Sequence, residues 1–375
     1  MAALIDSTLR EGEQTPGVYL RLDQKVAIVS GLARIGIEEI ELGHAVGDGD
    51  MPVLLAEARR LAPGARLALW CRALAPDIAA GGALAPDVLA MSLPVSDLHL
   101  ERRLGRSRQW LLDHIGIAAG LARSSGVGYV SLGLEDATRA DPDLLDAVCA
   151  RAAAAGLDRL RLADTVGIAT PASLTALLAR CRRHFGGAIG VHTHNDFGMA
   201  GANAIAAMEA GADWADVTVL GLGERAGNAR LEEVVGWLVL AGGETCYDTR
   251  AVVDLCRRVA PWAGRRIEAH HPLLGSRLFT CESGLHVDGL AKDARTYEPY
   301  APVAVGAERH VWVGKHAGRG AVRRRLAELG VELSAAAATD VATRVRRKAR
   351  AAGRPLSDAE LIGMARSAIA PASSP

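Results

Sequence analysis

The sequence has little of several features that mark specialised classes of protein. Aromatic residues make up only 4% of its 375 residues, and just 4 of the 43 basic side chains are lysines. The six cysteines are scattered without a CxxC pair, which argues against a disulfide framework or a thiolate zinc site and fits a reducing cytoplasm. No apolar run reaches the roughly 18 residues of a membrane-spanning helix, and Asp6 and Arg10 interrupt any signal-peptide core.

The charge balance excludes a further class. Acidic and basic residues number 43 each, so the chain lacks the surplus of cations that non-specific nucleic-acid binding requires. Half of the residues are hydrophobic, which is enough for a large buried core. We therefore expect a globular cytoplasmic protein that binds neither nucleic acid nor membranes.

The first 240 residues or so alternate between short runs rich in Val, Ile and Leu and longer amphipathic segments. A doubly wound open sheet would show a similar alternation, but eight evenly spaced units favour closure into a (β/α)8 TIM barrel. The expected strands are Ala3–Thr8, Glu39–Gly43, Arg66–Cys71, Leu89–Leu93, Gly128–Leu132, Arg159–Ala163, Ile189–His194 and Asp216–Leu220.

The alternation stops near Gly242, which indicates a change of domain. We expect a TIM-barrel catalytic domain over residues 1–245 and a helix and linker over 246–275. Residues 276–375 are expected to form a smaller, mainly helical C-terminal subdomain.

Polar residues gather at the ends of the expected strands, where TIM barrels carry their active sites. They are Arg10, Glu11 and Gln14 after the first strand, Glu135 after the fifth, Thr165 after the sixth, His192 to Asp196 around the end of the seventh, and Glu224 to Asn228 after the eighth.

His192 and His194 are the most informative pair. Side chains two apart on a strand point to the same face, so both imidazoles should enter the barrel side by side, with Glu11 as a third ligand. Two histidines and a carboxylate suit Mn, Mg, Zn, Co or Fe without choosing among them. The two histidines of an isolated HxH motif more often form only hydrogen bonds near the rim of a barrel. Here the charged residues at the other strand ends favour a metal site.

Two other features allow an alternative interpretation. The segment GLGERAGN, Gly221–Asn228, resembles a dinucleotide-binding loop, but its glycines are spaced GxGxxxG instead of GxGxxG. A tight loop that brings Asn228 toward the metal is therefore the simpler interpretation. His286 and Tyr297 lie beyond the barrel, where a single histidine is more often structural than catalytic.

Taken together, several motifs resemble a known family, the metal-dependent enzymes that condense acetyl-CoA with 2-oxo acids: the isopropylmalate, citramalate and homocitrate synthases. The chain is most similar to the nitrogen-fixation type of homocitrate synthase in LALWCRAL, SLPVSDLHL and EDATRAD. The motifs that carry the family resemblance run in the family's order: DSTLREGEQTPG, LADTVG, HTHNDFGMA, GLGERAGNA, ESGLHVDG and GKHAG.

The resemblance implies a role for each matching position. Glu11, His192 and His194 match the metal ligands, with Asn228 as a fourth contact in parts of the family. Arg10 matches the arginine that faces the acceptor's carbonyl oxygen. The remaining matches are Arg72 and Thr165 at acceptor-binding positions, and Glu135, His286 and Tyr297 as the acid–base group, with His286 and Tyr297 reaching in from the partner subunit of an obligate homodimer.

The resemblance implies an acyltransferase that converts acetyl-CoA and 2-oxoglutarate into homocitrate and CoA, for nitrogenase cofactor assembly or lysine synthesis. Three departures bear on the acceptor: Glu11 stands where the nitrogen-fixation enzymes usually have Asp, Ser131 where the lysine-pathway enzymes have arginine, and His44-Ala45 where relatives carry a small apolar residue and proline. We expect Gln14 to face the substrate. His44 is expected either to contact a distal carboxylate or phosphonate of the acceptor or to be a solvated loop histidine.

Alternative acceptors are phosphonopyruvate, pyruvate and 2-oxoisovalerate. A lyase like hydroxymethylglutaryl-CoA lyase is disfavoured because Gly221–Asn228 lacks that family's reactive cysteine. A non-catalytic paralogue is disfavoured because the charged constellation is intact.

Overall fold

The computed structural model describes residues 2–47, 49–282 and 284–369. The chain forms two compact units, Met1–Ile267 and Glu268–Pro375, each of which is described by itself. Among the described residues, none of the helices combines the length and the apolar character needed to span a membrane.

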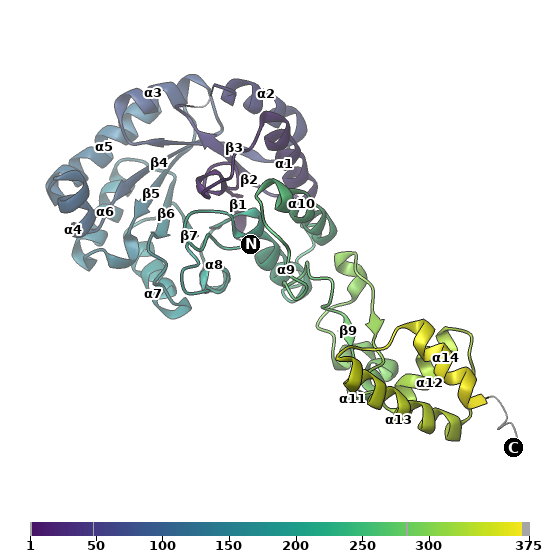
Figure 1. Cartoon of the computed structure of the whole chain (residues 1–375). Coiled ribbons are helices and arrows are strands. Elements are labelled where there is room, and N and C mark those ends of the chain that lie inside the picture. Colours follow the sequence, from purple (N-terminus) through teal and green to yellow (C-terminus); the bar gives the residue numbers. More distant parts are fainter. Residues whose placement is uncertain (1, 48, 283, 370–375) are drawn as a thin grey trace, which may run out of the picture. The chain divides into compact units, whose positions relative to one another are not determined.

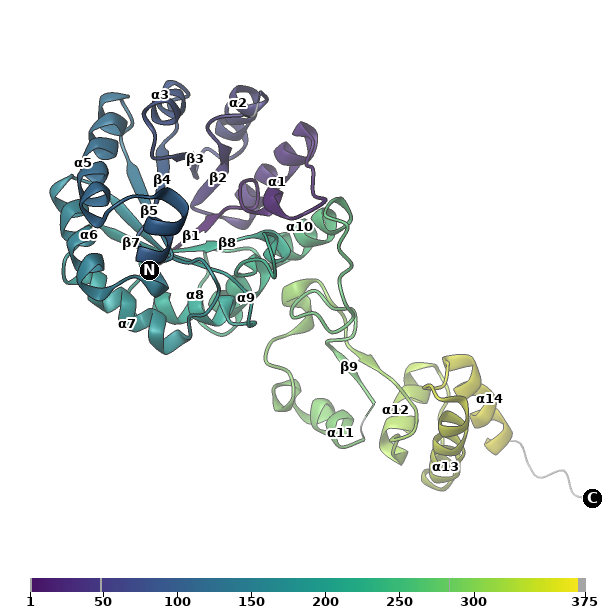
Figure 2. The same ribbon diagram turned by 60° about the vertical axis from the view of Figure 1, so that its left-hand side comes forward.

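The first unit is a closed barrel of eight parallel strands in sequential order, surrounded by helices (Figures 1 and 2). Strand β1 closes it by pairing with β2 on one side and with β8 on the other. The TIM barrel expected from the alternation is thus confirmed. The strands are β1 Ala3–Asp6, β2 Glu39–His44, β3 Arg66–Arg72, β4 Val88–Pro94, β5 Val130–Glu135, β6 Arg159–Asp164, β7 Ala188–Thr193 and β8 Trp214–Val217.

At the start of several helices of this unit, side chains cap the free N–H groups. Ser107 accepts from the N–H of Trp110, and Thr170 with Ser173 forms a capping box; prolines occupy the first turn of several others, where no N–H is needed. The helices are α1 Leu22–Ile35, α2 Met51–Leu61, α3 Ala75–Ala83, α4 Asp97–His99, α5 Arg108–Ser124, α6 Pro142–Ala154, α7 Pro171–Arg182, α8 Ala200–Glu209, α9 Leu231–Leu240 and α10 Thr249–Trp262.

Several boundaries differ from the sequence-based expectation, and three of these differences are described here. Strand β8 ends at Val217 instead of Leu220, because Leu220 has a φ of 58° and lies in a short 3-10 helix. Strand β5 extends to Glu135, which therefore sits at the barrel mouth. Helix α10, expected beside a linker, belongs to the barrel unit, since its buried apolar face packs against α1.

The second unit is mainly helical. It contains α11 Gly284–Lys292, α12 Arg319–Glu328, α13 Ala335–Ala352 and α14 Asp358–Ile369, with a two-stranded parallel sheet of β9 Thr280–Cys281 and β10 His310–Val311. Its core lies among α12, α13 and α14, where Val322, Val341 and Leu361 are fully or almost fully buried. This unit therefore has a hydrophobic core of its own.

Candidate active site

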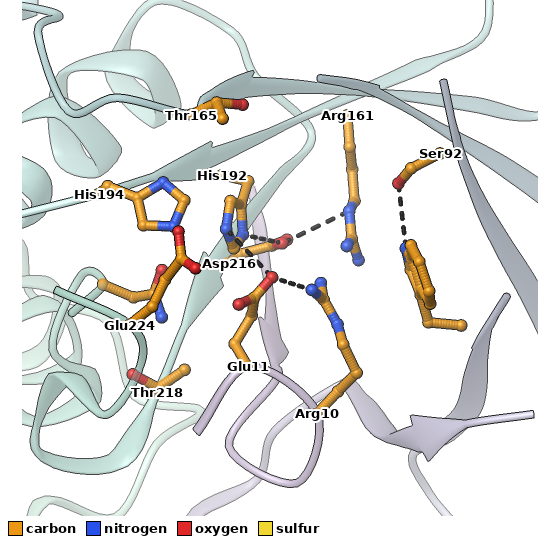
Figure 3. A network of polar contacts seen from close by, with 12 residues as sticks. Arg10, Glu11, Ser92, Arg161, Thr165, His192, His194, Asp216, Thr218 and Glu224 are labelled. Atoms are coloured by element: carbon orange, nitrogen blue, oxygen red, sulfur yellow. Dashed lines mark hydrogen bonds and ion pairs between the residues drawn. The ribbon is translucent and has the colours of Figure 1, made fainter. Parts of the chain in front are cut away.

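Glu11, His192 and His194 form a buried cluster at the barrel mouth (Figure 3). One potential ligand atom of each lies within 4.8 Å of the others, and Nε2 of His192 is 3.6 Å from Oε1 of Glu11. Strand β7 ends at Thr193, one residue earlier than expected, yet the two imidazole rings still lie 5.0 Å apart. The three residues are thus brought together as the sequence predicted.

Further contacts orient both imidazoles. Nδ1 of His192 lies 2.8 Å from Oδ2 of Asp216, and Nδ1 of His194 lies 3.0 Å from the carbonyl oxygen of Asp164. A carbonyl can only accept, so His194 carries its proton on Nδ1 and its Nε2 lone pair is left to bind an ion. Burial, reinforced by the neighbouring His192, lowers the pKa of His194 to about 3, which keeps the ring neutral.

Asn228 offers a fourth oxygen. Its Nδ2 donates to the carbonyl of Leu222 at 2.9 Å, whereas its buried Oδ1 has no hydrogen-bond partner in the described part of the chain. The backbone of Asn228 pairs with that of His194 in an isolated bridge. Two imidazoles, a carboxylate and a nearby unsatisfied amide oxygen fit a divalent cation.

The loop Gly221–Asn228 is folded tightly on itself. A side chain at Gly227, which has a φ of 85°, would meet the carbonyl oxygen of Gly221, and the N–H of Asn228 donates to that oxygen at 3.2 Å. The glycines therefore allow the compact loop that presents Asn228, and this use of them favours the tight-loop interpretation over a phosphate cradle.

Arg10 is anchored between two carboxylates. Its Nε donates to Oε2 of Glu41 at 2.6 Å, and Nη1 contacts Glu11. Burial alone would raise the pKa of Glu41, but the guanidinium groups of Arg10 and Arg161 lower it to about 2. Glu41 is thus a fixed anion that holds a buried cation. Figure 3 shows that this cation, Arg10, lies beside the candidate metal ligand Glu11.

A cavity of about 240 Å³ opens over this cluster. Most of the predicted site residues of the barrel line it: Arg10, Glu11, Gln14, Glu135, Thr165, His192 and His194. Glu135 contacts Arg103, and Oγ1 of Thr165 accepts a hydrogen bond from the backbone N–H of Asp136 at 2.8 Å.

His44 and Arg72 are not among the lining residues. Gly43, with a φ of 144°, belongs to a bulge in β2 that pairs His44 with Trp70, and the two rings meet edge to face at 5.1 Å. His44 therefore contacts a residue that lines the cavity, Trp70, without lining the cavity itself. Arg72 is exposed and makes a bidentate ion pair with Asp77.

Sequence reasoning missed several lining residues: Trp70, Ser92, Arg103 and Arg161. Arg161 donates to Glu41 at 2.9 Å, and Nε1 of Trp70 donates to Oγ of Ser92 at 3.0 Å. A usable signal was present for Arg161. Glu39-Ile-Glu41 on one strand and Arg159-Leu-Arg161 on another place opposite charges on alternate, same-facing positions.

His286 and Tyr297 belong to the second unit. Their rings lie 4.3 Å apart at 73°, both side chains are exposed, and a side chain at Gly289 would overlap the Tyr297 ring. The structure thus brings these two residues together.

Both units match known families. Residues 2–259 match the family described as HMGL-like, and residues 273–352 match the one described as homocitrate synthase post-HMGL domain-like. The two matches together span most of the chain.

Curated relatives carry three related names. The chain is 39% identical over 96% of its length to "2-isopropylmalate synthase 2" of Caldanaerobacter subterraneus, of which the match covers 94%. It is 41% identical over 87% of its length to a homocitrate synthase of Frankia alni, covering 93% of that protein. It is 38% identical over 96% of its length to a putative (R)-citramalate synthase of Methanoculleus marisnigri, covering 71% of it.

Solved structures share the barrel. The hydroxymethylglutaryl-CoA lyase of Pseudomonas aeruginosa matches 71% of this chain and 94% of its own, with a TM-score of 0.63 and 22% identity. At that identity the likeness concerns the fold alone.

Proposed function

The chain belongs to the HMGL-like family, among the isopropylmalate, homocitrate and citramalate synthases, and from this membership we propose that it condenses acetyl-CoA with a 2-oxo acid. The observation that carries the proposal is the buried Glu11–His192–His194 cluster with Arg10 beside it, on one cavity. A lone metal site would not need a buried arginine that is held against its carboxylate.

The Glu11–His192–His194 cluster and Arg10 both act on the carbonyl group of the acceptor in this proposal. Glu11, His192 and His194, with Asn228, would hold a divalent cation, which when bound supplies Lewis-acid polarisation of the acceptor's carbonyl. Arg10 donates hydrogen bonds to the oxygen that gains negative charge as the carbon–carbon bond forms. Its clamp between Glu41 and Glu11 fixes the guanidinium in advance, so little reorganisation accompanies the reaction.

Proton transfer is assigned to Glu135, His286 and Tyr297. A base removes a proton from the acetyl methyl group, the resulting carbanion equivalent attacks the ketone, and water then cleaves the thioester to release CoA. Glu135 lines the cavity of its own barrel. His286 and Tyr297 come from the partner subunit in this proposal, which makes the protein a homodimer with shared active sites.

The preferred acceptor in this proposal is 2-oxoglutarate, which would give homocitrate. His44, which packs on the lining residue Trp70, is the feature that favours examining other acceptors with a polar distal group, phosphonopyruvate among them.

The test is release of free thiol from acetyl-CoA by the purified protein, loaded with Mn²⁺ or stripped by EDTA, against five acids: 2-oxoglutarate, pyruvate, 2-oxoisovalerate, oxaloacetate and phosphonopyruvate. Metal-dependent release with 2-oxoglutarate alone supports the full proposal. A strong preference for another acid keeps the reaction and changes the acceptor, and no release with any of the five contradicts the proposal.

A further inference from the structure

Two layers of opposite charges cross the interior of the barrel. In the layer that does not border the cavity, Arg159 of β6 makes a bidentate ion pair with Glu39 of β2, at 2.9 and 2.5 Å, and also donates to Oγ of Ser131. In the layer that borders the cavity, Arg161 of β6 donates to Glu41 of β2 at 2.9 Å. Strands β2 and β6 stand four positions apart in the eight-stranded ring, so both arginines reach across the barrel.

The two layers differ in what they are connected to. Glu39 contacts Arg159 and Arg66, neither of which lines the cavity. The second oxygen of Glu41, in contrast, accepts from Arg10 at 2.6 Å. Nε of Arg161 lies 3.4 Å from Oδ2 of Asp216, the same oxygen that lies 2.8 Å from Nδ1 of His192.

Arg161 is therefore the central member of a chain of contacts that has a functional group at each end: Arg10, Glu41, Arg161, Asp216 and His192. Figure 3 shows the part that runs from Arg161 through Asp216 to His192. We infer that Arg161 is a positioning residue, which holds Glu41 and Asp216 at a fixed separation and thereby sets the placement of Arg10 and the orientation of the His192 ring together. This inference rests on the proposed function, since it concerns the same site.

Burial and geometry argue for this role over a purely stabilising one. Arg161, Glu41 and Asp216 are almost completely buried, and buried ion pairs often contribute no more stability than well-packed apolar side chains would. The planar guanidinium can address two carboxylates in different directions through different nitrogens, as it does here, whereas a lysine ammonium is a single point of charge.

The experiment compares Arg161→Lys with Arg159→Lys. Both replacements keep a positive charge on β6 at an equally buried site, but only Arg161 is linked to Arg10 and His192. The readouts are the Kd for Mn²⁺ by calorimetric titration of the metal-free protein, kcat at saturating Mn²⁺, KM for acetyl-CoA, and the Tm. If either lysine variant fails to fold, Arg161→Gln and Arg159→Gln replace the pair.

We expect Arg161→Lys to raise the Kd for Mn²⁺ and lower kcat by about tenfold or more each, the range seen when outer partners of metal ligands are changed. Arg159→Lys should lower the Tm and leave Kd and kcat within about twofold of wild type. The inference is overturned, and the proposed function kept, if the wild-type protein binds Mn²⁺ and turns over but Arg161→Lys behaves like wild type. The same conclusion follows if Arg159→Lys loses as much Mn²⁺ affinity and kcat as Arg161→Lys. Wild-type protein that binds no Mn²⁺ overturns the proposed function with it.

Discussion

Nδ1 of His192 and Oδ2 of Asp216 lie 2.8 Å apart, with both side chains buried. An ionised carboxylate can only accept, so this contact places the ring proton on Nδ1 and leaves Nε2 facing Glu11, 3.6 Å away. The ring is thus prepared to bind an ion. A buried histidine kept only for packing would not need its second nitrogen turned toward another carboxylate.

Replacing His192 with Ala is expected to abolish turnover and weaken Mn²⁺ binding by more than about 100-fold, because a direct ligand is lost and changes to outer partners alone cost about 10–100-fold. Calorimetric titration and thiol release measure the two effects. His184→Ala is the control, since His184 lies near Asp146 away from the cavity. Full activity of His192→Ala in metal-free buffer would rule out this site.

The sequence predicted the barrel well because each strand–helix unit repeats a local hydrophobic pattern. It predicted Glu11, His192 and His194 because polar residues at strand ends share one rim of such a barrel. It did not reveal the Glu41–Arg161 pair, since the two residues are separated by 120 positions and meet only when the barrel closes. The bulge at Gly43, which turns His44 onto Trp70, depends on pairing between two strands and had no comparable signal in the sequence.

Asp6 gives the fold a pH dependence that can be measured. Burial raises its pKa from 3.8 to about 7; Oδ1 accepts from the N–H of Thr8, and Oδ2 has no partner among the described residues. Between these two pKa values the folded protein retains a proton that the unfolded chain has lost. The stabilisation linked to this proton is complete below pH 3.8 and is lost as the pH rises through 7.

Asp6→Asn cannot titrate, so its stability relative to wild type should increase between pH 5 and pH 8. The expected change is of the order of 2 kcal/mol, since each unit of pKa shift corresponds to about 1.4 kcal/mol. Denaturant unfolding at the two pH values measures it, with Asp254→Asn on the surface of α10 as the control. An identical pH dependence of wild type and Asp6→Asn would contradict the prediction.

His44→Ile should change the choice of acceptor. The imidazole ring of His44 meets the Trp70 ring edge to face, and Trp70 lines the cavity. Replacing His44 with an apolar side chain should therefore change the polarity around Trp70 and the position of its ring. We expect the ratio of kcat/KM for 2-oxoglutarate over pyruvate to change about tenfold, with KM for acetyl-CoA within about twofold. Val46→Ala, an exposed neighbour, is the control. Unchanged selectivity would remove His44 from the acceptor site.

Subunit exchange tests whether two chains build each active site. Arg10→Ala and His286→Ala should each be inactive, because one removes a barrel cation and the other a group assigned to the partner's site. When they are mixed and allowed to exchange, each mixed dimer should regain one intact site, so about one quarter of all sites should become active. The matched control mixes Arg10→Ala with His192→Ala: both defects lie in the barrel, so every site keeps one and no activity should return. Recovery in the first mixture alone requires shared sites. If the subunits exchange and neither mixture regains activity, His286 would have to act in the active site of its own chain.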